Sequence, residues 1–154
     1  MWEAYIEVPV KGDEAALAAI EQQMNVSLPA DVRQVILERA GQVTEPEAIN
    51  VGEARETAFS PILYAGGVKD HQRYTYSIEF VLSTLQGWAE VEELSQLKLL
   101  PFASNSASGY FCVDFRETSA NPPIVFVDLG YDFEEEGAFK PAAADLASLL
   151  EKLH

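Results

Sequence analysis

The sequence contains very little cysteine and histidine, the residues that most often build disulfides and metal sites. Its 154 residues include a single cysteine, Cys112, so no disulfide can form within the chain, which suits a reducing compartment. The two histidines, His71 and His154, have no neighbouring ligand at a useful spacing. We therefore expect no metal site, and no motif in the chain points to a cofactor.

Basic residues are also scarce. Ten lysines and arginines stand against 25 aspartates and glutamates, which gives a formal net charge of −15. Recognition of phosphates depends on Lys and Arg, so this charge argues against DNA, RNA or an anionic membrane as a partner. It favours a basic protein as partner, although acidity of this kind also serves solubility alone.

Long apolar runs are missing as well. No apolar stretch approaches the roughly 20 residues that span a bilayer. The N-terminus lacks the basic segment and following apolar run of a secretory signal. Hydrophobic residues make up 48% and charged residues 23%, which is the composition of a globular protein. We expect one soluble, cytoplasmic domain over residues 1–154.

The stretch Lys98–Gly130 predicts the core of the fold. Lys98–Ala103 is apolar and leads into a polar turn that closes on Gly109. Tyr110–Phe115 alternates between two faces, and Ile124–Val127 is an uninterrupted apolar run, as in a strand covered on both faces. We expect a three-stranded antiparallel meander under helices, in a single-domain α+β fold whose sheet is mostly antiparallel.

Helical spacing of apolar residues appears in four segments: Asp13–Met24, Pro29–Ala40, Tyr74–Gln86 and the segment that begins at Pro141. Asp13 and Asn25 suit the two ends of the first helix, and glycines are expected to end the second and third. Further short strands are expected at 48–51 and 57–65. The first ten residues fit either a half-buried strand or a helical turn.

Candidates for catalysis are weak. Cys112 falls on a face of a central strand, where a lone cysteine is usually a small buried hydrophobe, although His71 could approach it. Asp114 and Asp128 could act as an acid–base pair, but their places near strand ends favour structural roles. The chain has no G-x-S-x-G nucleophile elbow and no phosphate-binding glycine loop. We therefore expect no catalytic residues and no enzymatic activity.

The densest acidic segment is Asp128–Glu136, which holds five carboxylates, two aromatic residues and no base. Such a run is usually a solvated loop with its aromatic residues turned inward. The alternative is a docking surface, in which aromatic anchors ringed by acids meet a basic, concave partner site. The candidate partner-binding residues are Tyr131, Asp132, Phe133, Glu134, Glu135 and Glu136, with Glu90, Glu92 and Glu93 extending the same field.

Three groups of motifs resemble the SUKH superfamily, the Smi/Knr-type proteins. The first is a helix with Leu17 and Glu21, followed by Val26-Ser27-Leu28-Pro29-Ala30-Asp31 and a second helix closed by Gly41. The second is Leu100-Pro101-Phe102-Ala103, a polar turn, Gly109-Tyr110-Phe111-Cys112-Val113-Asp114-Phe115 and Pro123-Ile124-Val125-Phe126. The third is the terminal helix with Leu149-Leu150-Glu151-Lys152-Leu153. Together these motifs cover most of the chain in the order found in the superfamily.

The resemblance implies an α+β fold and a function without catalysis. Bacterial members are mostly immunity proteins that bind and block polymorphic toxins, often nucleases or deaminases, in the cytoplasm. The resemblance thus implies a cognate, basic protein toxin as partner. A general interaction or regulatory module without a toxin is the alternative, and an unrecognised hydrolase that uses Cys112 or an aspartate pair is a third hypothesis.

Overall fold

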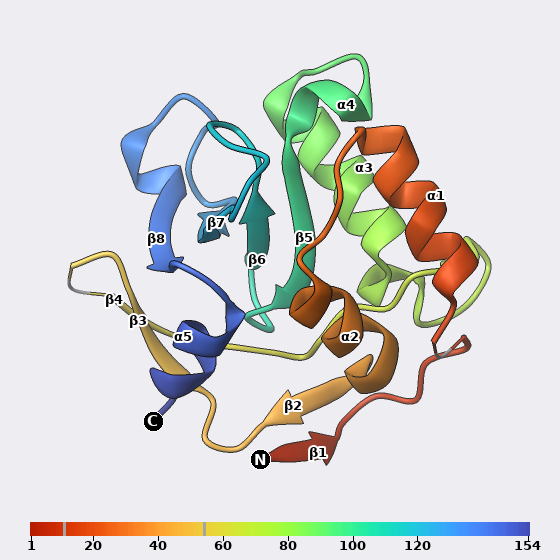
Figure 1. Ribbon diagram of the computed structural model, residues 1–154, viewed down its shortest axis with the longest axis horizontal. Coiled ribbons are helices and arrows are strands. Elements are labelled where there is room, and N and C mark those ends of the chain that lie inside the picture. The colour runs from red at the N-terminus through yellow and green to blue at the C-terminus, as the bar shows by residue number, and fades with distance from the viewer. Residues whose placement is uncertain (11, 54) are drawn as a thin grey trace.

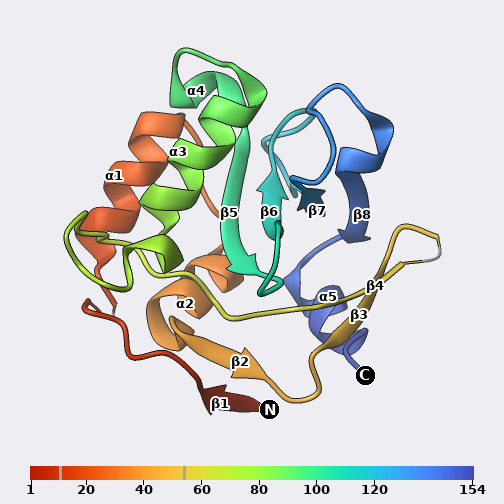
Figure 2. The ribbon, with the colours of Figure 1, turned by 180° about the vertical axis from the view of Figure 1, so that it is seen from behind.

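The computed structural model describes residues 1–10, 12–53 and 55–154, and its largest unit is a four-stranded antiparallel sheet (Figures 1 and 2). The sheet follows chain order, with β5 (Leu99–Ser104), β6 (Gly109–Asp114), β7 (Ile124–Asp128) and β8 (Phe139–Ala143) as consecutive neighbours. The first three strands confirm the predicted meander. The fourth strand was not predicted.

Burial of the strands explains why the meander is the centre of the fold. Every residue of β5 and β7 is buried, so both faces of these strands are covered, as the unbroken apolar run in β7 indicates. Phe111 of β6 packs against Phe126 of β7 and against Phe59, with ring centroids 5.1 Å apart in both pairs. A turn over Asn105–Ser108 links β5 to β6, and the Asn105 side chain accepts hydrogen bonds from two amides, those of Ala107 and Gly109.

Helices lie along one side of the sheet. Figure 1 shows α1 (Glu14–Met24) and α3 (Ile78–Ala89) side by side next to β5, with α2 (Ala30–Arg39) below them and the short α4 (Leu94–Leu97) above. Their buried faces are the predicted apolar stripes, with Leu17, Ile20 and Met24 in α1 and Val32 and Ile36 in α2. The combination of helices and antiparallel sheets confirms the predicted α+β class.

The ends of α1 agree with the prediction. The Asp13 carboxylate accepts a hydrogen bond of 2.9 Å from the amide of Ala16, and Asn25 takes the left-handed conformation with φ 58°. The predicted bounds of α3 are wrong at both ends. A 3-10 turn, η1 (Tyr74–Tyr76), precedes it, Ser77 caps it, and it runs through Gly87 to Ala89. Gly87 has open space around it, so nothing in its surroundings obliges the helix to end there.

Two small antiparallel pairs lie below the main sheet in Figure 1. β1 (Trp2–Ala4) pairs with β2 (Gln42–Thr44), so the strand interpretation of the first residues holds for their beginning. β3 (Ala48–Val51) pairs with β4 (Arg55–Ala58) and confirms the predicted strand at 48–51. Only the start of the expected strand at 57–65 is regular, because Pro61 interrupts it, with a cis peptide bond after Ser60.

The C-terminal segment differs from the prediction. Pro141 does not open the last helix but lies in β8, opposite Val125 of β7. β8 is an edge strand of the four-stranded sheet, where a residue without an amide hydrogen is tolerated. The helix α5 (Leu146–Glu151) begins after Asp145, whose carboxylate accepts a hydrogen bond from the Ser148 amide. Within the described residues, no helix is long and apolar enough to cross a membrane.

Candidate partner-binding surface

Three aromatic side chains pack together between the end of α3 and the β7–β8 loop. The ring centroid of Trp88 lies 5.3 Å from that of Phe133 and 5.6 Å from that of Phe139, and the latter two lie 5.6 Å apart. The contacts are edge-on or tilted, the arrangements that aromatic pairs prefer. We call Trp88, Phe133 and Phe139 the aromatic cluster. It joins α3 to the segment that carries the predicted acidic surface.

Hydrogen bonds give the acidic loop, residues 128–138, a defined turn. The indole nitrogen of Trp88 donates to the carbonyl of Tyr131 over 2.9 Å. The Asp132 amide donates to the carboxylate of Glu135, whose own amide donates back to the Asp132 carbonyl. The Tyr131 ring lies close over Gly137, where an added Cβ would come within 2.6 Å of it. The loop is therefore held at both ends by specific contacts.

The structure separates the roles of the two aromatic residues in this loop. Tyr131 is 38% exposed, whereas Phe133 is half-buried against Trp88. Inward packing, the ordinary behaviour of aromatic residues in a charged loop, therefore applies to Phe133, and Tyr131 is the accessible ring. Four of the five carboxylates of the loop lie on exposed residues, Asp132, Glu134, Glu135 and Glu136, whereas Asp128 is buried.

The second group of predicted residues follows Trp88 directly. Glu90, Glu92 and Glu93 are exposed and lie on the connection from α3 to α4, at the same end of the molecule as the acidic loop (top of Figures 1 and 2). Glu90 ends α3 in the left-handed conformation, with φ 56°. Glu93 forms a capping box with Gln96 at the start of α4. Trp88 thus connects the two acidic segments, which together we call the acidic end.

Two basic residues that sequence reasoning missed lie beside the acidic end. The ammonium of Lys140 is 4.7 Å from the centroid of the Tyr131 ring and donates to the Gly137 carbonyl. The guanidinium of Arg116 is 4.1 Å from the Phe139 ring and forms two hydrogen bonds of 2.9 Å to Asp114. Lys140 follows the acidic loop directly in sequence, whereas no local pattern relates Arg116 to it, because folding alone brings the β6–β7 loop to Phe139.

The candidate acid–base pair is divided between opposite ends of the sheet. Asp128 pairs in register with Gly109, the first residue of β6, whereas Asp114 is the last residue of that strand. Five residue steps along a strand put the two roughly 17 Å apart. Asp114 accepts a hydrogen bond from the Arg116 amide, as expected for a turn residue. Asp128, which is 4% exposed, accepts from the Gly130 amide and pairs with Arg55 over 2.5 Å.

Cys112 is fully buried in β6, as a small core residue would be. Burial, with a smaller contribution from the nearby Asp114 carboxylate, raises the pKa of its thiol far above the ordinary value. His71 bonds instead to the backbone amide of Arg73 through Nδ1, over 3.0 Å. Among the residues described, no group of three or more His, Cys, Asp or Glu is placed to hold a metal ion.

Comparison with known proteins gives one match. The family model of the SMI1 / KNR4 family (SUKH-1) matches residues 11–152, which include the helices α1 to α5, the whole four-stranded sheet and the acidic end. Searches of curated proteins and of solved structures return no match. Because the family model covers nearly the full length, the chain belongs to the SMI1 / KNR4 family (SUKH-1).

Proposed function

We propose that this protein is a non-catalytic immunity protein that binds a cognate toxin domain in the cytoplasm and blocks it. Membership of the SMI1 / KNR4 family supports the proposal, since the resemblance to SUKH proteins implies toxin-binding immunity proteins among bacterial members. The expected toxin is a basic protein, such as a nuclease or a deaminase. Inhibition by occupation needs no catalytic group, only a surface complementary to the partner.

The observation that carries the proposal is the acidic end on its aromatic support. The β7–β8 loop presents four exposed carboxylates around one accessible aromatic ring, Tyr131. Trp88 holds this loop through its ring contacts and its indole N–H, so the charges are displayed on a fixed backbone. A preformed surface loses little conformational freedom on binding, which favours affinity. Tyrosine is among the residues enriched at the hot spots of protein interfaces.

Charge also sets the expected kinetics. A formal net charge of −15 attracts a basic domain over a distance of about 10 Å at moderate salt. Steered association of this kind can reach on the order of 10⁸ M⁻¹s⁻¹ at low salt and falls as salt is added. An inhibitor that must capture a toxin before it acts benefits from this rate.

The direct experiment titrates a toxin with the purified protein. The toxin is the product of the gene adjacent to the one encoding this chain, and its catalytic activity is measured across the titration. We expect activity to fall to zero at equimolar inhibitor and a complex to elute from a sizing column. Unchanged activity together with no complex would reject the immunity function. A genome neighbourhood without any toxin-like gene would favour the general interaction module.

A second experiment tests the surface separately from the function. One variant reverses four charges in the acidic loop: Asp132→Lys, Glu134→Lys, Glu135→Lys and Glu136→Lys. The matched control reverses four exposed acids elsewhere: Glu38→Lys, Glu47→Lys, Asp70→Lys and Glu151→Lys. Each change adds two charges to −15, so both variants have a formal net charge of −7.

The comparison isolates the position of the charges from their number. We expect the loop variant to associate at least about tenfold more slowly than the control at low salt, because close charges dominate steering. We also expect its association rate to depend less on salt. Equal association rates for the two variants would show that the acidic end is not the docking surface, while leaving inhibition itself intact.

A further inference from the structure

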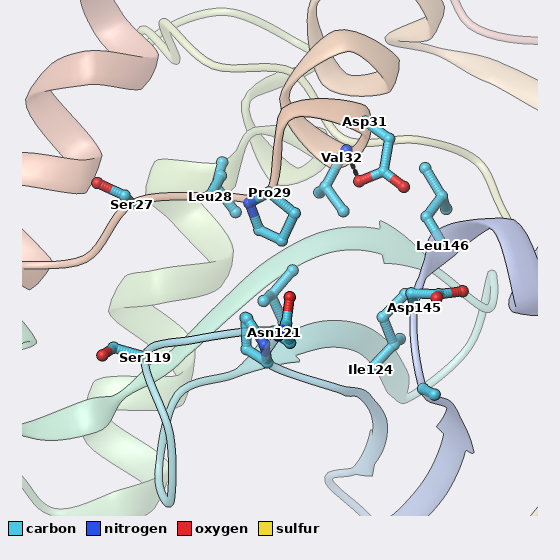
Figure 3. Close-up of a pocket in the computed structure, with 13 residues that line it drawn as sticks. Ser27, Leu28, Pro29, Asp31, Val32, Ser119, Asn121, Ile124, Asp145 and Leu146 are labelled. Carbon is cyan, nitrogen blue, oxygen red and sulfur yellow. Dashed lines mark hydrogen bonds between the residues drawn. The ribbon is translucent and has the colours of Figure 1, made fainter.

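A cleft of about 500 Å³ lies away from the aromatic cluster, between the start of α2, the β6–β7 loop and the segment that leads into α5 (Figure 3). Figure 3 shows Pro29 and Val32 facing Asn121 and Ile124 across this space. The floor is made by buried aliphatic side chains from five elements or connections: Leu28, Val32, Val113, Ile124 and Leu146. The cleft therefore offers an apolar floor assembled from segments far apart in the sequence.

Two carboxylates stand at one end of the cleft, and among the described residues that line it there is no lysine or arginine. One oxygen of Asp31 accepts a hydrogen bond of 2.8 Å from the Val32 amide, and its other oxygen has no partner within the described residues. Asp145 accepts from the Ser148 amide over 2.8 Å, and its hydrogen bonds to Ser148 lower the pKa of its carboxyl. Both groups are exposed, so the cleft presents negative charge to solvent.

The cleft continues into a second hollow of about 450 Å³, with which it shares Ser27 and Ser119. This hollow lies beside the connection from α1 to α2. Its acidic residue, Glu21, accepts from the Leu28 amide and pairs with Arg33, so that carboxylate supports the α1–α2 connection. Because the two hollows share these two lining residues, they adjoin on the surface of the protein.

We propose that the cleft binds an arginine side chain presented by an extended segment of a partner protein. The three methylene groups of arginine match the aliphatic floor, and its planar guanidinium can donate to Asp31 and Asp145 at the end of the cleft. An anionic ligand would be repelled by the same carboxylates. Lysine fits less well, since its ammonium is more strongly hydrated and lacks the planar fork that bonds both oxygens of a carboxylate.

The β6–β7 loop connects this cleft to the acidic end. Ser119, Asn121 and Pro122 of the loop line the cleft, and Arg116 at its start packs on Phe139 of the aromatic cluster. One partner can therefore contact both places. The assignment rests on the proposed function in taking the partner to be a basic protein, but its test needs no toxin.

The test uses N-acetyl-arginine amide as the probe and N-acetyl-citrulline amide, its neutral isostere, as the control ligand. Amide proton–nitrogen NMR spectra of the full chain are recorded during both titrations. We expect saturable shifts for the amides of Val32, Asn121 and Leu146 with the arginine probe. With citrulline, the same amides should shift at least about threefold less at equal concentration, because the charge-assisted hydrogen bonds are lost.

Variants identify the carboxylates. Asp31→Asn keeps the shape of the side chain, and Asp145→Ser keeps a good N-cap for α5, so both remove charge without removing structure. The matched control is Asp70→Asn, an exposed aspartate outside the cleft. Each cleft variant is expected to weaken the probe about threefold or more, and the control to leave it unchanged.

Several results would overturn the assignment. Shifts confined to the acidic loop would mean that the probe binds only the general negative field. The carboxylates would have no role if the citrulline and arginine probes gave equal shifts. The same would follow if Asp31→Asn bound the arginine probe as tightly as the wild type does. None of these results bears on toxin inhibition, so failure of the cleft and failure of the immunity function remain distinguishable.

Discussion

Trp88 is the residue on which the acidic end depends, and its truncation is the most informative single change. In Trp88→Ala, the β7–β8 loop loses its contacts to α3 through Phe133, Phe139 and the indole hydrogen bond to the Tyr131 carbonyl. Trp88→Phe is the matched variant. It keeps an aromatic ring at the same place and removes the N–H donor together with part of the ring volume.

The expected cost follows from these contacts. Truncating a fully buried tryptophan or phenylalanine to alanine costs about 3–5 kcal/mol. Trp88 is only half-buried, which reduces this cost, and alanine favours the helix by about 0.5 kcal/mol. Its two aromatic pairs contribute about 0.5–1.5 kcal/mol each beyond area burial. We therefore expect Trp88→Ala to lower the free energy of unfolding by about 2–3 kcal/mol, and Trp88→Phe by about 1 kcal/mol or less.

Two measurements check the expectation. Urea unfolding followed by far-ultraviolet circular dichroism gives the free energies without relying on the fluorescence of the altered residue. Hydrogen exchange of the Glu135 and Ala138 amides, which bond within the loop, reports on the loop itself. In Trp88→Ala these amides should exchange at least about tenfold faster. A cost below about 1 kcal/mol with unchanged loop exchange would show that the aromatic cluster does not hold the surface in place.

Two further predictions concern packing and pH. In Gly109→Ala the new Cβ would lie 2.3 Å from the Phe126 ring, so we expect the free energy of unfolding to fall by about 2 kcal/mol. Gly87 has open space around it on α3, so Gly87→Ala should raise the free energy of unfolding by about 0.5–1 kcal/mol. Urea midpoints that move in the same direction for the two variants would contradict this. The pKa of His154 is raised above its ordinary 6.5. The largest cause is its hydrogen bond to the backbone of Lys152, and the next is its hydrogen bond to the Glu56 side chain. Because the pKa of His154 is higher in the folded protein than in the unfolded chain, the protonated ring stabilises the fold. This contribution is complete at a pH below the unfolded pKa and disappears as pH rises through the folded pKa. Glu56→Gln should lower the pKa of the His154 ring in an NMR titration, and an unchanged pKa would exclude the contact.

Local patterns were sufficient to predict the centre of the fold. The strands β5 to β7 follow from apolar runs, an alternating segment and turn residues that are all close in sequence, and their antiparallel pairing needs only short connections. The first helix follows for the same reason, since Asp13 and Asn25 cap it through contacts within a few residues. An element whose formation depends on residues close to it in sequence can therefore be predicted from the local sequence pattern.

The elements that the sequence did not predict depend on partners far away. β8 contains Pro141 and has no clean alternation, and it is a strand because β7 pairs with it along one edge. The ion pair of Arg55 with Asp128 joins residues 73 positions apart, so no spacing rule could find it. In the candidate site, charge and composition indicated the acidic loop and allowed for inward-facing aromatic residues. They did not indicate that Phe133 packs inward while Tyr131 stays exposed, or that Trp88 on another element supports the loop.

The two proposed contact regions should act on different rate constants, and this gives a way to tell one footprint from two. Exposed acids in the β7–β8 loop act on an approaching basic domain before contact, so their reversal slows association. An arginine seated in the cleft acts after contact, so Asp31→Asn should speed dissociation and leave association nearly unchanged. The β6–β7 loop borders both regions, with Asn121 at the cleft and Arg116 at the aromatic cluster. If one partner covers both regions, charge reversal in the loop slows its association and Asp31→Asn speeds its dissociation. If Asp31→Asn weakens binding of the arginine probe but leaves the dissociation rate of the toxin unaltered, the cleft binds a different protein.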